Sequence, residues 1–143
     1  MKIKELEDCH LDHVAIVVES LDSACKIYED MGISFLPERE IVEDQGVKTA
    51  FAPVDENANI ELLEPYGEDG PIHKYLAKKG PGIHHLCFRV KDVKAKGIEL
   101  SDKGYILLYP EPKEGAHNCL VNFIHPKSTG GVLIEISQKR GES

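Results

Sequence analysis

The 143-residue sequence lacks tryptophan and has few aromatic side chains, at 6% of its residues. Its unbroken apolar runs are short, as at 14–18, and stay far below the roughly 20 residues that a membrane-spanning helix requires. Basic residues are also scarce, because 17 Lys and Arg stand against 25 Asp and Glu and leave a formal net charge of −8. A nucleic-acid surface needs clustered cations, so the shortage of basic residues argues against a nucleic-acid binder. The short apolar runs argue against a membrane-spanning protein.

Cysteine pairs are missing as well, since the chain contains no CxxC motif. The pattern predicts reduced thiols that act as small buried apolar side chains, and neither a disulfide framework nor a zinc knuckle. The first ten residues, MKIKELEDCH, are too polar for the apolar part of a signal peptide, so we expect a cytoplasmic protein. The four scattered cysteines are Cys9, Cys25, Cys87 and Cys119.

The sequence contains an internal repeat. A shift of 72 residues aligns LDHVAIVVESLDSACKIYEDMGISFL with IHHLCFRVKDVKAKGIELSDKGYILL without a gap and superimposes His13 on His85. Each copy opens with a short apolar stretch, at 11–18 and 83–90, that predicts a buried strand. A capping residue, apolar positions three and four apart, and a glycine then predict an amphipathic helix. The caps are Ser20 and Asp92, and the glycines are Gly32 and Gly104.

Short apolar stretches separated by turn residues follow each helix and predict three strands per copy. The segment GPIHKYLAKKG between the copies predicts a connecting helix at about 71–79, with proline near its start. We therefore expect an α+β fold, with residues 1–143 forming one domain of two βαβββ modules at about 11–66 and 83–138. The expected strands are 33–36, 47–54 and 59–63 in the first module, and 106–109, 120–124 and 132–136 in the second.

Four chemically active residues stand in register within the repeat. His13 and His85 lie in the opening strands, and Glu61 and Glu135 lie in the closing strands among apolar neighbours. A buried carboxylate is unfavourable unless it is paired or bound to a metal. Two neutral imidazoles and two carboxylates balance a divalent cation, and mixed N/O ligation suits Zn, Co, Ni, Mn or Fe. We predict a metal site; the remaining histidines are predicted to be structural or exposed, with His117 and His125 as candidates to line a substrate channel.

The sequence from about Leu11 to Gln138 resembles the vicinal oxygen chelate superfamily and, within it, the methylmalonyl-CoA epimerase family. The resemblance rests on LDHVAIVV, NIELLEP, GPGIHHLCFRV, LLYPEPKEGAH and GAHNCLVNFIHPKSTGGVLIEIS. It implies a cupped, barrel-like mixed sheet and a divalent cation, with cobalt expected and zinc, nickel or manganese as alternatives. It also implies an acyl-CoA thioester substrate and a homodimer. The implied metal ligands are His13, Glu61, His85 and Glu135.

The implied activity interconverts (2R)- and (2S)-methylmalonyl-CoA by removal of the C2 proton through a metal-stabilised enolate, with Glu135 and Glu61 as catalytic residues. Thr49 stands where the family places a further carboxylate. Either Glu43, Lys48, a bound water or Glu61 then takes the role of that carboxylate, or the substrate is not methylmalonyl-CoA. Lysines that are candidates to meet the coenzyme phosphates, none of them assigned, are Lys78, Lys79, Lys113 and Lys127.

Two other functions remain open for this sequence. One is a lactoylglutathione lyase of the glyoxalase I type, which shares the fold and a similar ligand set; the stretches HPKSTGGVLIE and IELLEP favour the epimerase over it. The other is a metal-free protein that binds a small molecule in the same fold without converting it. An extradiol dioxygenase is disfavoured, because that chemistry uses two histidines and one carboxylate and leaves Glu61 unexplained.

Overall fold

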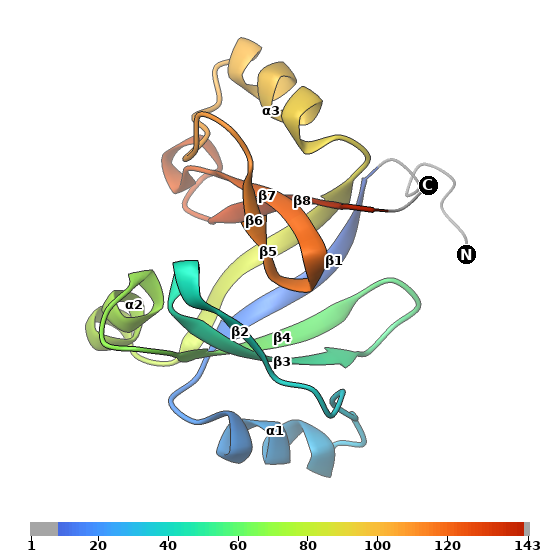
Figure 1. Ribbon diagram of the computed structural model, residues 1–143, viewed down its shortest axis with the longest axis vertical. Coiled ribbons are helices and arrows are strands. Elements are labelled where there is room, and N and C mark those ends of the chain that lie inside the picture. The colour runs from blue at the N-terminus through green and yellow to red at the C-terminus, as the bar shows by residue number, and fades with distance from the viewer. Residues whose placement is uncertain (1–8, 142–143) are drawn as a thin grey trace. The chain divides into compact units, whose positions relative to one another are not determined.

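The computed structural model describes residues 9–141 (Figure 1). The order of elements is strand, helix and three strands, twice, so the predicted α+β class and βαβββ modules are confirmed. No helix in residues 9–141 is long and apolar enough to cross a bilayer. The first module holds β1 (Cys9–Val17), α1 (Leu21–Asp30), β2 (Glu40–Val42), β3 (Val47–Pro53) and β4 (Asn59–Pro65). After α2 (Pro71–Lys79), the second holds β5 (Gly82–Val90), α3 (Val93–Asp102), β6 (Lys113–Gly115), β7 (Cys119–Ile124) and β8 (Ile134–Lys139).

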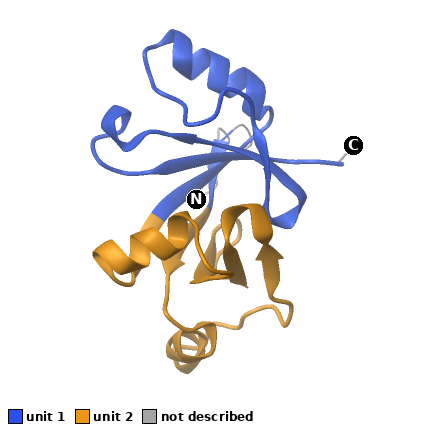
Figure 2. Cartoon of the chain, turned by 60° about the vertical axis from the view of Figure 1, so that its left-hand side comes forward, with its two compact units in different colours: residues 1–12, 85–143 blue, residues 13–84 orange. Residues whose placement is uncertain are grey.

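The described chain forms two compact units, which Figure 2 colours separately. The first unit comprises residues 13–84, and the second comprises residues 9–12 with 85–141. In the first unit, β1 pairs in parallel with β4, and β3 lies antiparallel between β4 and β2. In the second, β5 pairs in parallel with β8, and β7 lies antiparallel between β8 and β6. Each unit therefore has a mixed sheet of the same strand order.

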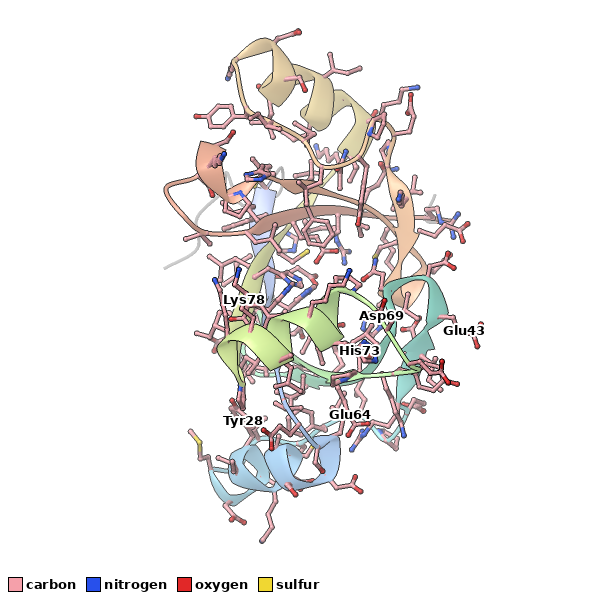
Figure 3. All side chains as sticks on the ribbon, turned by 90° about the vertical axis from the view of Figure 1, so that its left-hand side faces the viewer. Tyr28, Glu43, Glu64, Asp69, His73 and Lys78 are labelled. Atoms are coloured by element: carbon pink, nitrogen blue, oxygen red, sulfur yellow. The ribbon has the colours of Figure 1, made fainter. Side chains whose placement is uncertain are left out.

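The start of α1 is fixed by two side chains. Ser20 accepts a hydrogen bond from the Ser23 amide, and Glu64 Oε1 accepts one from the Leu21 amide at 2.9 Å. Both satisfy amides that a helix leaves without partners in its first turn. Glu64 comes from the end of β4, and Figure 3 labels it. The helix ends at Asp30, and Gly32, two residues later, has a φ of +100° that suits a residue without a Cβ.

The start of α3 repeats this arrangement in the second unit. Asp92 accepts a hydrogen bond from the Ala95 amide, and Gln138 Oε1 accepts one from the Val93 amide at 2.9 Å. Gln138 lies on β8, as Glu64 lies on β4. The two modules therefore connect their closing strand to their helix start in the same way, which fixes the closing strand against the rest of the module.

The stretches 33–36 and 106–109 are not strands, in contrast to the prediction. Proline follows each stretch, at Pro37 and Pro110, and cannot donate to a strand ladder. The outer strand of each sheet comes instead from a later segment, β2 or β6. Backbone bonds still join both stretches to their sheets, from Leu36 N to Phe51 O in the first, and from Leu108 N to Phe123 O and from His125 N to Ile106 O in the second, all at 2.8 Å.

The apolar core of the first unit lies on both faces of its sheet. One cluster packs α1 against the sheet, and the other packs α2 against the opposite face, through Ile72. On that second face, β1, β3 and β4 contribute only small and medium apolar side chains to the cluster. This face also carries the predicted ligands His13 and Glu61, because side chains alternate along each strand. The cluster contains Ala15, Val17, Val47, Leu63 and Ile72.

Candidate active site

The first unit contains one buried histidine–glutamate pair. His13 Nε2 lies 3.4 Å from Glu61 Oε1, and the two residues are 6% and 5% exposed. The parallel register places Glu61 beside Ala15, two residues along β1 from His13 and therefore on the same face. The ring of Phe51 stands edge-on to the imidazole with centroids 6.3 Å apart. Strand geometry thus brings together two predicted ligands that are far apart in sequence.

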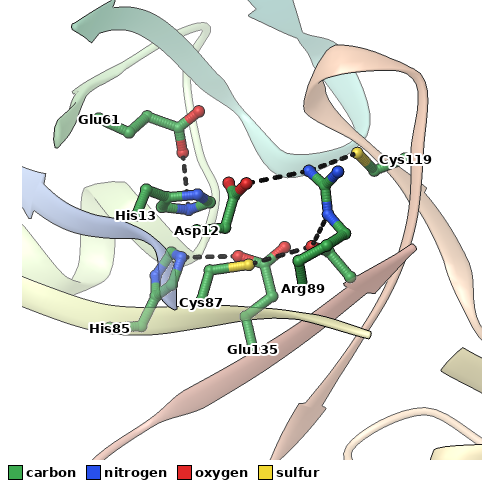
Figure 4. A network of polar contacts seen from close by, with 9 residues as sticks. Asp12, His13, Glu61, His85, Cys87, Arg89, Cys119 and Glu135 are labelled. Atoms are coloured by element: carbon green, nitrogen blue, oxygen red, sulfur yellow. Dashed lines mark hydrogen bonds and ion pairs between the residues drawn. The ribbon is translucent and has the colours of Figure 1, made fainter. Parts of the chain in front are cut away.

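The second unit contains the equivalent pair. His85 Nε2 lies 2.8 Å from Glu135 Oε1 (Figure 4), and both residues are buried. The register places Glu135 beside Cys87, two residues along β5 from His85. Phe123 stands edge-on to this imidazole with centroids 5.5 Å apart. The repeat therefore includes the aromatic neighbour, since Phe51 and Phe123 are also 72 residues apart.

These donors suit a divalent metal. Each pair offers an imidazole nitrogen and a carboxylate oxygen in a buried setting, and both atom types are ligands of first-row divalent cations. A metal would also compensate the burial of two carboxylates. That the pair His13 and Glu61 and the pair His85 and Glu135 share one cation stays a prediction.

Thr49 is buried on β3, where the family resemblance leads one to expect a carboxylate. It pairs with Leu63 across the β3–β4 register and shares the face that carries Glu61. Lys48, the next residue along the strand, alternates to the opposite face. Glu43 is exposed in the short 3-10 turn Glu43–Gln45. The sheet therefore places neither Lys48 nor Glu43 beside Thr49 on the site face.

Glu40 is an acidic residue of this face that sequence reasoning missed. It is the Cα partner of Thr49 across the β2–β3 register, so its side chain leaves the sheet on the same side as Thr49 and Glu61. Its strand has only three residues, too few for an alternation pattern to identify it. The signal that does identify it is the pairing of β2 with β3.

The second unit has a polar network on β5 and β8, the strands of its histidine–glutamate pair, which also includes Asp12 and Cys119. Arg89 Nη2 lies 3.1 Å from Asp12 Oδ1, and the Arg89 side chain donates to Ser137 Oγ at 3.2 Å and to Cys119 Sγ at 3.6 Å (Figure 4). Cys87 Sγ donates to Ser137 Oγ at 3.3 Å. Burial raises the pKa of the Cys119 thiol, while the Arg89 charge opposes that rise.

The cysteines follow the prediction in most respects. All four are free thiols, and Cys25, Cys87 and Cys119 are buried. Cys9 is exposed, so the prediction of a small buried side chain is wrong there. Its strand lies at the beginning of the described chain, and its burial decreases toward that end. The hydrogen bonds of Cys87 and Cys119 were missed, because sequence alone gives no partner for a lone thiol.

Tyr109 contacts both Lys113 and Phe123, the ring beside His85. Its ring stands edge-on to Phe123 with centroids 6.0 Å apart, and Lys113 Nζ lies 4.2 Å from its centroid. Burial, and then the charge of Glu135, raises the pKa of the Tyr109 phenol. Tyr109 is the last residue of the stretch 106–109, which was expected to be a strand, and its role as a ring contact was therefore missed.

Several other histidines have structural contacts, as predicted. His84 packs edge-on against Tyr75 with centroids 4.8 Å apart. His73, labelled in Figure 3, has Nε2 2.9 Å from the Gly67 carbonyl oxygen. His125 Nδ1 accepts a hydrogen bond from the backbone amide two residues later. A substrate channel lined by His117 and His125 stays a prediction.

Comparison with known proteins places these features in a family. Residues 12–123 match the family model of the Glyoxalase/Bleomycin resistance protein/Dioxygenase superfamily. The mitochondrial methylmalonyl-CoA epimerase of Dictyostelium discoideum is 39% identical over 131 residues, which cover 90% of this chain and 78% of that protein. A crystal structure of methylmalonyl-CoA epimerase from Mycobacterium tuberculosis is 42% identical with a TM-score of 0.84, covering 90% of this chain and 87% of that one.

A further solved structure carries a bound ligand. It is a variant of Streptomyces coelicolor methylmalonyl-CoA epimerase in complex with 2-nitronate-propionyl-CoA. It is 34% identical to this chain with a TM-score of 0.86, covering 92% of this chain and 97% of that one. The similarity extends over nearly the full length of both chains and is not confined to one module.

Proposed function

Because the chain belongs to the Glyoxalase/Bleomycin resistance protein/Dioxygenase superfamily, we propose that it is a metal-dependent epimerase that interconverts (2R)- and (2S)-methylmalonyl-CoA. The observation that carries this proposal is the buried histidine–glutamate pair found once in each module. The choice of thioester follows from the relatives, which are methylmalonyl-CoA epimerases. The acyl-CoA ligand bound to the Streptomyces coelicolor enzyme supports a substrate of this class.

The metal site of this proposal uses both pairs. His13 and His85 would supply imidazole nitrogens, and Glu61 and Glu135 carboxylate oxygens. When bound, a divalent cation supplies Lewis-acid stabilisation of negative charge on substrate oxygens, worth several kcal/mol. Cobalt is the expected metal from the family resemblance, with zinc, nickel and manganese as alternatives that suit the same donors.

The two glutamates are the proposed acid and base. The C2–H bond of the substrate lies between a thioester and a carboxylate, so its electron pair moves onto the thioester when the proton leaves. In one direction Glu135 takes that proton, and Glu61 returns a proton to the opposite side of C2, which inverts the centre. The reverse direction exchanges the two roles, so each carboxyl group needs to reach one face of the same carbon.

The test follows the C2 proton and the metal together. Purified protein is incubated with (2R)- or (2S)-methylmalonyl-CoA in deuterated water, and C2 exchange and inversion are followed by mass spectrometry and chiral analysis. We expect both epimers to exchange their C2 proton and elemental analysis to find near-stoichiometric metal. His85→Ala should lose both the exchange and the metal. His84→Ala is the matched control, because its ring packs against Tyr75 and alternates away from His85.

The other functions predict different results. Bound metal without C2 exchange would overturn the epimerase and point to a lyase that acts on a glutathione hemithioacetal. A protein that binds an acyl-CoA without metal and without exchange would point to sequestration. A homodimer and a cytoplasmic location stay predictions, and light scattering after gel filtration measures the first of these.

A further inference from the structure

Positive charge gathers on one face of the second unit's sheet. The register pairs Lys113 with Val121, Val121 with Ser137, and Ser137 with Arg89, so these side chains leave the sheet on one side. Phe123 and Glu135 pair on that same side, two residues farther along their strands. Lys139 also belongs to it, as the partner of Cys119. We call this face, with Lys113, Arg89, Lys139 and Glu135, the cationic face.

The first unit gives an internal reference for this charge. The positions that correspond by strand register to Lys113, Arg89 and Lys139 are Glu40, Val17 and Pro65. None of these three is basic. The two faces therefore differ in charge, because one carries three cations and the other has none at the matching positions. This difference occurs in a chain whose formal net charge is −8. The cationic face is therefore the part of the repeat suited to an anion.

Lys113 is the cation of this face whose partner is a ring. Its ammonium group lies 4.2 Å from the Tyr109 centroid, and no carboxylate of residues 9–141 forms an ion pair with it. Arg89, in contrast, has its charge compensated by Asp12 at 3.1 Å. A cation–π contact positions an ammonium group and leaves its other N–H donors available. Lys113 can therefore donate to an incoming anion without breaking an ion pair.

Ring contacts connect Lys113 to the candidate metal ligands. From Lys113 the contacts run through Tyr109 and Phe123 to His85, each ring meeting the next edge-on. A ligand that reaches both Lys113 and the pair His85 and Glu135 would lie along these rings. The Tyr109 phenol also offers a hydrogen-bond donor in the side chain that contacts Lys113.

We propose that Lys113, positioned on the Tyr109 ring, binds an anionic group of the thioester substrate. The inference rests on the proposed function for the identity of the ligand. Two parts of methylmalonyl-CoA supply this chemistry, namely the phosphates of the coenzyme and the free carboxylate of the acyl group. The other three lysines considered from the sequence, Lys78, Lys79 and Lys127, lie outside the cationic face.

The test compares Lys113→Gln with the unmodified protein in binding and in turnover. Dissociation constants are measured by calorimetry for methylmalonyl-CoA, free coenzyme A and methylmalonyl-pantetheine, which keeps the carboxylate but lacks the coenzyme's nucleotide. We expect about a tenfold loss of affinity at low ionic strength for the ligands that carry the recognised group. The loss should shrink at about 0.15 M salt, where screening acts over roughly 8 Å. KM should rise in parallel while kcat stays unchanged.

Lys94→Gln is the matched control. Lys94 lies on α3, where its side chain forms an exposed pair with Glu111 at 3.6 Å, and its replacement removes the same charge from the same unit. We expect its affinities to stay within about twofold of the unmodified protein, as for an exposed pair. Thermal unfolding of both variants verifies that they fold.

The outcomes separate the sources and the two proposals. A loss for methylmalonyl-CoA and coenzyme A alone assigns Lys113 to the phosphates, and a loss for methylmalonyl-CoA and methylmalonyl-pantetheine alone assigns it to the carboxylate. Unchanged affinity of Lys113→Gln for all three ligands, or an equal loss in Lys94→Gln, overturns the inference. Weakened binding in a protein that exchanges no C2 proton would support the anion site and reject the epimerase, because the binding measurement requires no turnover.

Discussion

The two modules share a skeleton and differ in what they place on it. Both have a buried histidine–glutamate pair, an edge-on phenylalanine and a helix start bonded to the closing strand. On the face of the first module, Val17 and Leu63 lie in an apolar cluster, whereas Arg89 and Ser137 take the matching positions of the second. The repeat thus preserves the histidine–glutamate pairs and the contacts around them, and leaves the surrounding charge free to diverge.

The guanidinium group of Arg89 has several polar contacts at the position where the first module has Val17. Arg89 has an ion pair with Asp12 and hydrogen-bond contacts with Ser137 and Cys119. The side chains of Arg89 and Asp12 remain 24% and 14% exposed, so neither charge is fully removed from water. Val17, at 0% exposure, has no such partners. The contacts of Arg89 therefore compensate a partly buried charge that would be unfavourable without a partner.

The largest effect should come from removing one proposed base at a time. Glu135→Gln and Glu61→Gln each keep an amide oxygen for the metal but cannot take a proton. Net inversion should fall about 10²- to 10⁴-fold in either variant. Each variant should still exchange the C2 proton of one epimer in deuterated water, and the epimer that exchanges should differ between the two variants. Glu43→Gln, on an exposed turn, is the control. Full activity in Glu61→Gln together with a loss in Glu40→Gln would instead make Glu40 the second acid/base group.

Exchanging the charge between modules should come next. Val17→Arg places an unpaired cation in an apolar cluster and should lower the free energy of unfolding by about 3–5 kcal/mol. Arg89→Val leaves Asp12 without its partner in a partly exposed setting and should lower it by about 1–2 kcal/mol, discounted for solvent screening. Urea unfolding measures both. Equal losses would show that the network of Arg89 does not distinguish the two faces.

Alkaline pH should weaken both modules through one buried thiol in each. Burial raises the pKa of Cys25 and of Cys119 above the ordinary thiol value of 9.0. Above that value the unfolded chain releases these protons first, so the free energy of unfolding falls as pH rises, by at most about 1.4 kcal/mol per pH unit for each thiol. Urea unfolding at pH about 8 and about 10 should show this fall. Cys25→Ala and Cys119→Ala should each flatten it, and an unchanged slope would contradict the assignment.

A smaller effect concerns the helices. Gly97 lies inside α3 at the position where α1 has the buried Cys25. A Cβ at Gly97 would meet Leu107 Cγ at 3.9 Å, an ordinary contact, so Gly97→Ala should raise the free energy of unfolding by about 0.5–1 kcal/mol. Gly104→Ala is the opposite control, because its φ of +98° disfavours a side chain. Destabilisation by Gly97→Ala would mean that this helix cannot accept even a methyl group.

The smallest effect tests the two helix starts. Glu64 brings a charge to the first amide of α1, whereas Gln138 brings a neutral oxygen to that of α3. Glu64→Gln should lower the free energy of unfolding by about 0.3–1 kcal/mol at neutral pH, and Gln138→Glu should raise it by a similar amount. Thermal unfolding in low and high salt checks both. Shifts that are insensitive to salt would argue against an interaction with the helix dipole.

Much of this comparison was available from the sequence. The 72-residue shift aligned the opening strands, caps and glycine stops, and it superimposed His13 on His85. Glu61 and Glu135 follow these histidines by 48 and 50 residues, so they fall at equivalent points of the closing strands. Those features depend on local patterns, which a repeat makes visible twice. The expected strands at 33–36 and 106–109 were wrong, because apolar content alone does not show where backbone donors find partners.

The polar contacts needed coordinates. Asp12, Arg89 and Ser137 lie far apart in sequence, and only the pairing of β5 with β8 brings Arg89 and Ser137 together. Glu40 and Lys113 lie on strands of three residues, where a slip of one position would turn each side chain to the other face. Sequence reasoning had four lysines to choose from and no means of ranking them.

The sequence by itself determined the module order, the helix ends and the residue types of both histidine–glutamate pairs, because hydrophobic period, caps and repeats act over short distances along the chain. The tertiary structure alone decided which side chains face one another across strands: that His85 meets Glu135 at 2.8 Å, that Asp12 compensates Arg89, and that Lys113 rests on Tyr109. The reason is physical, since strand register sets the facing of every side chain and depends on hydrogen bonds between distant segments.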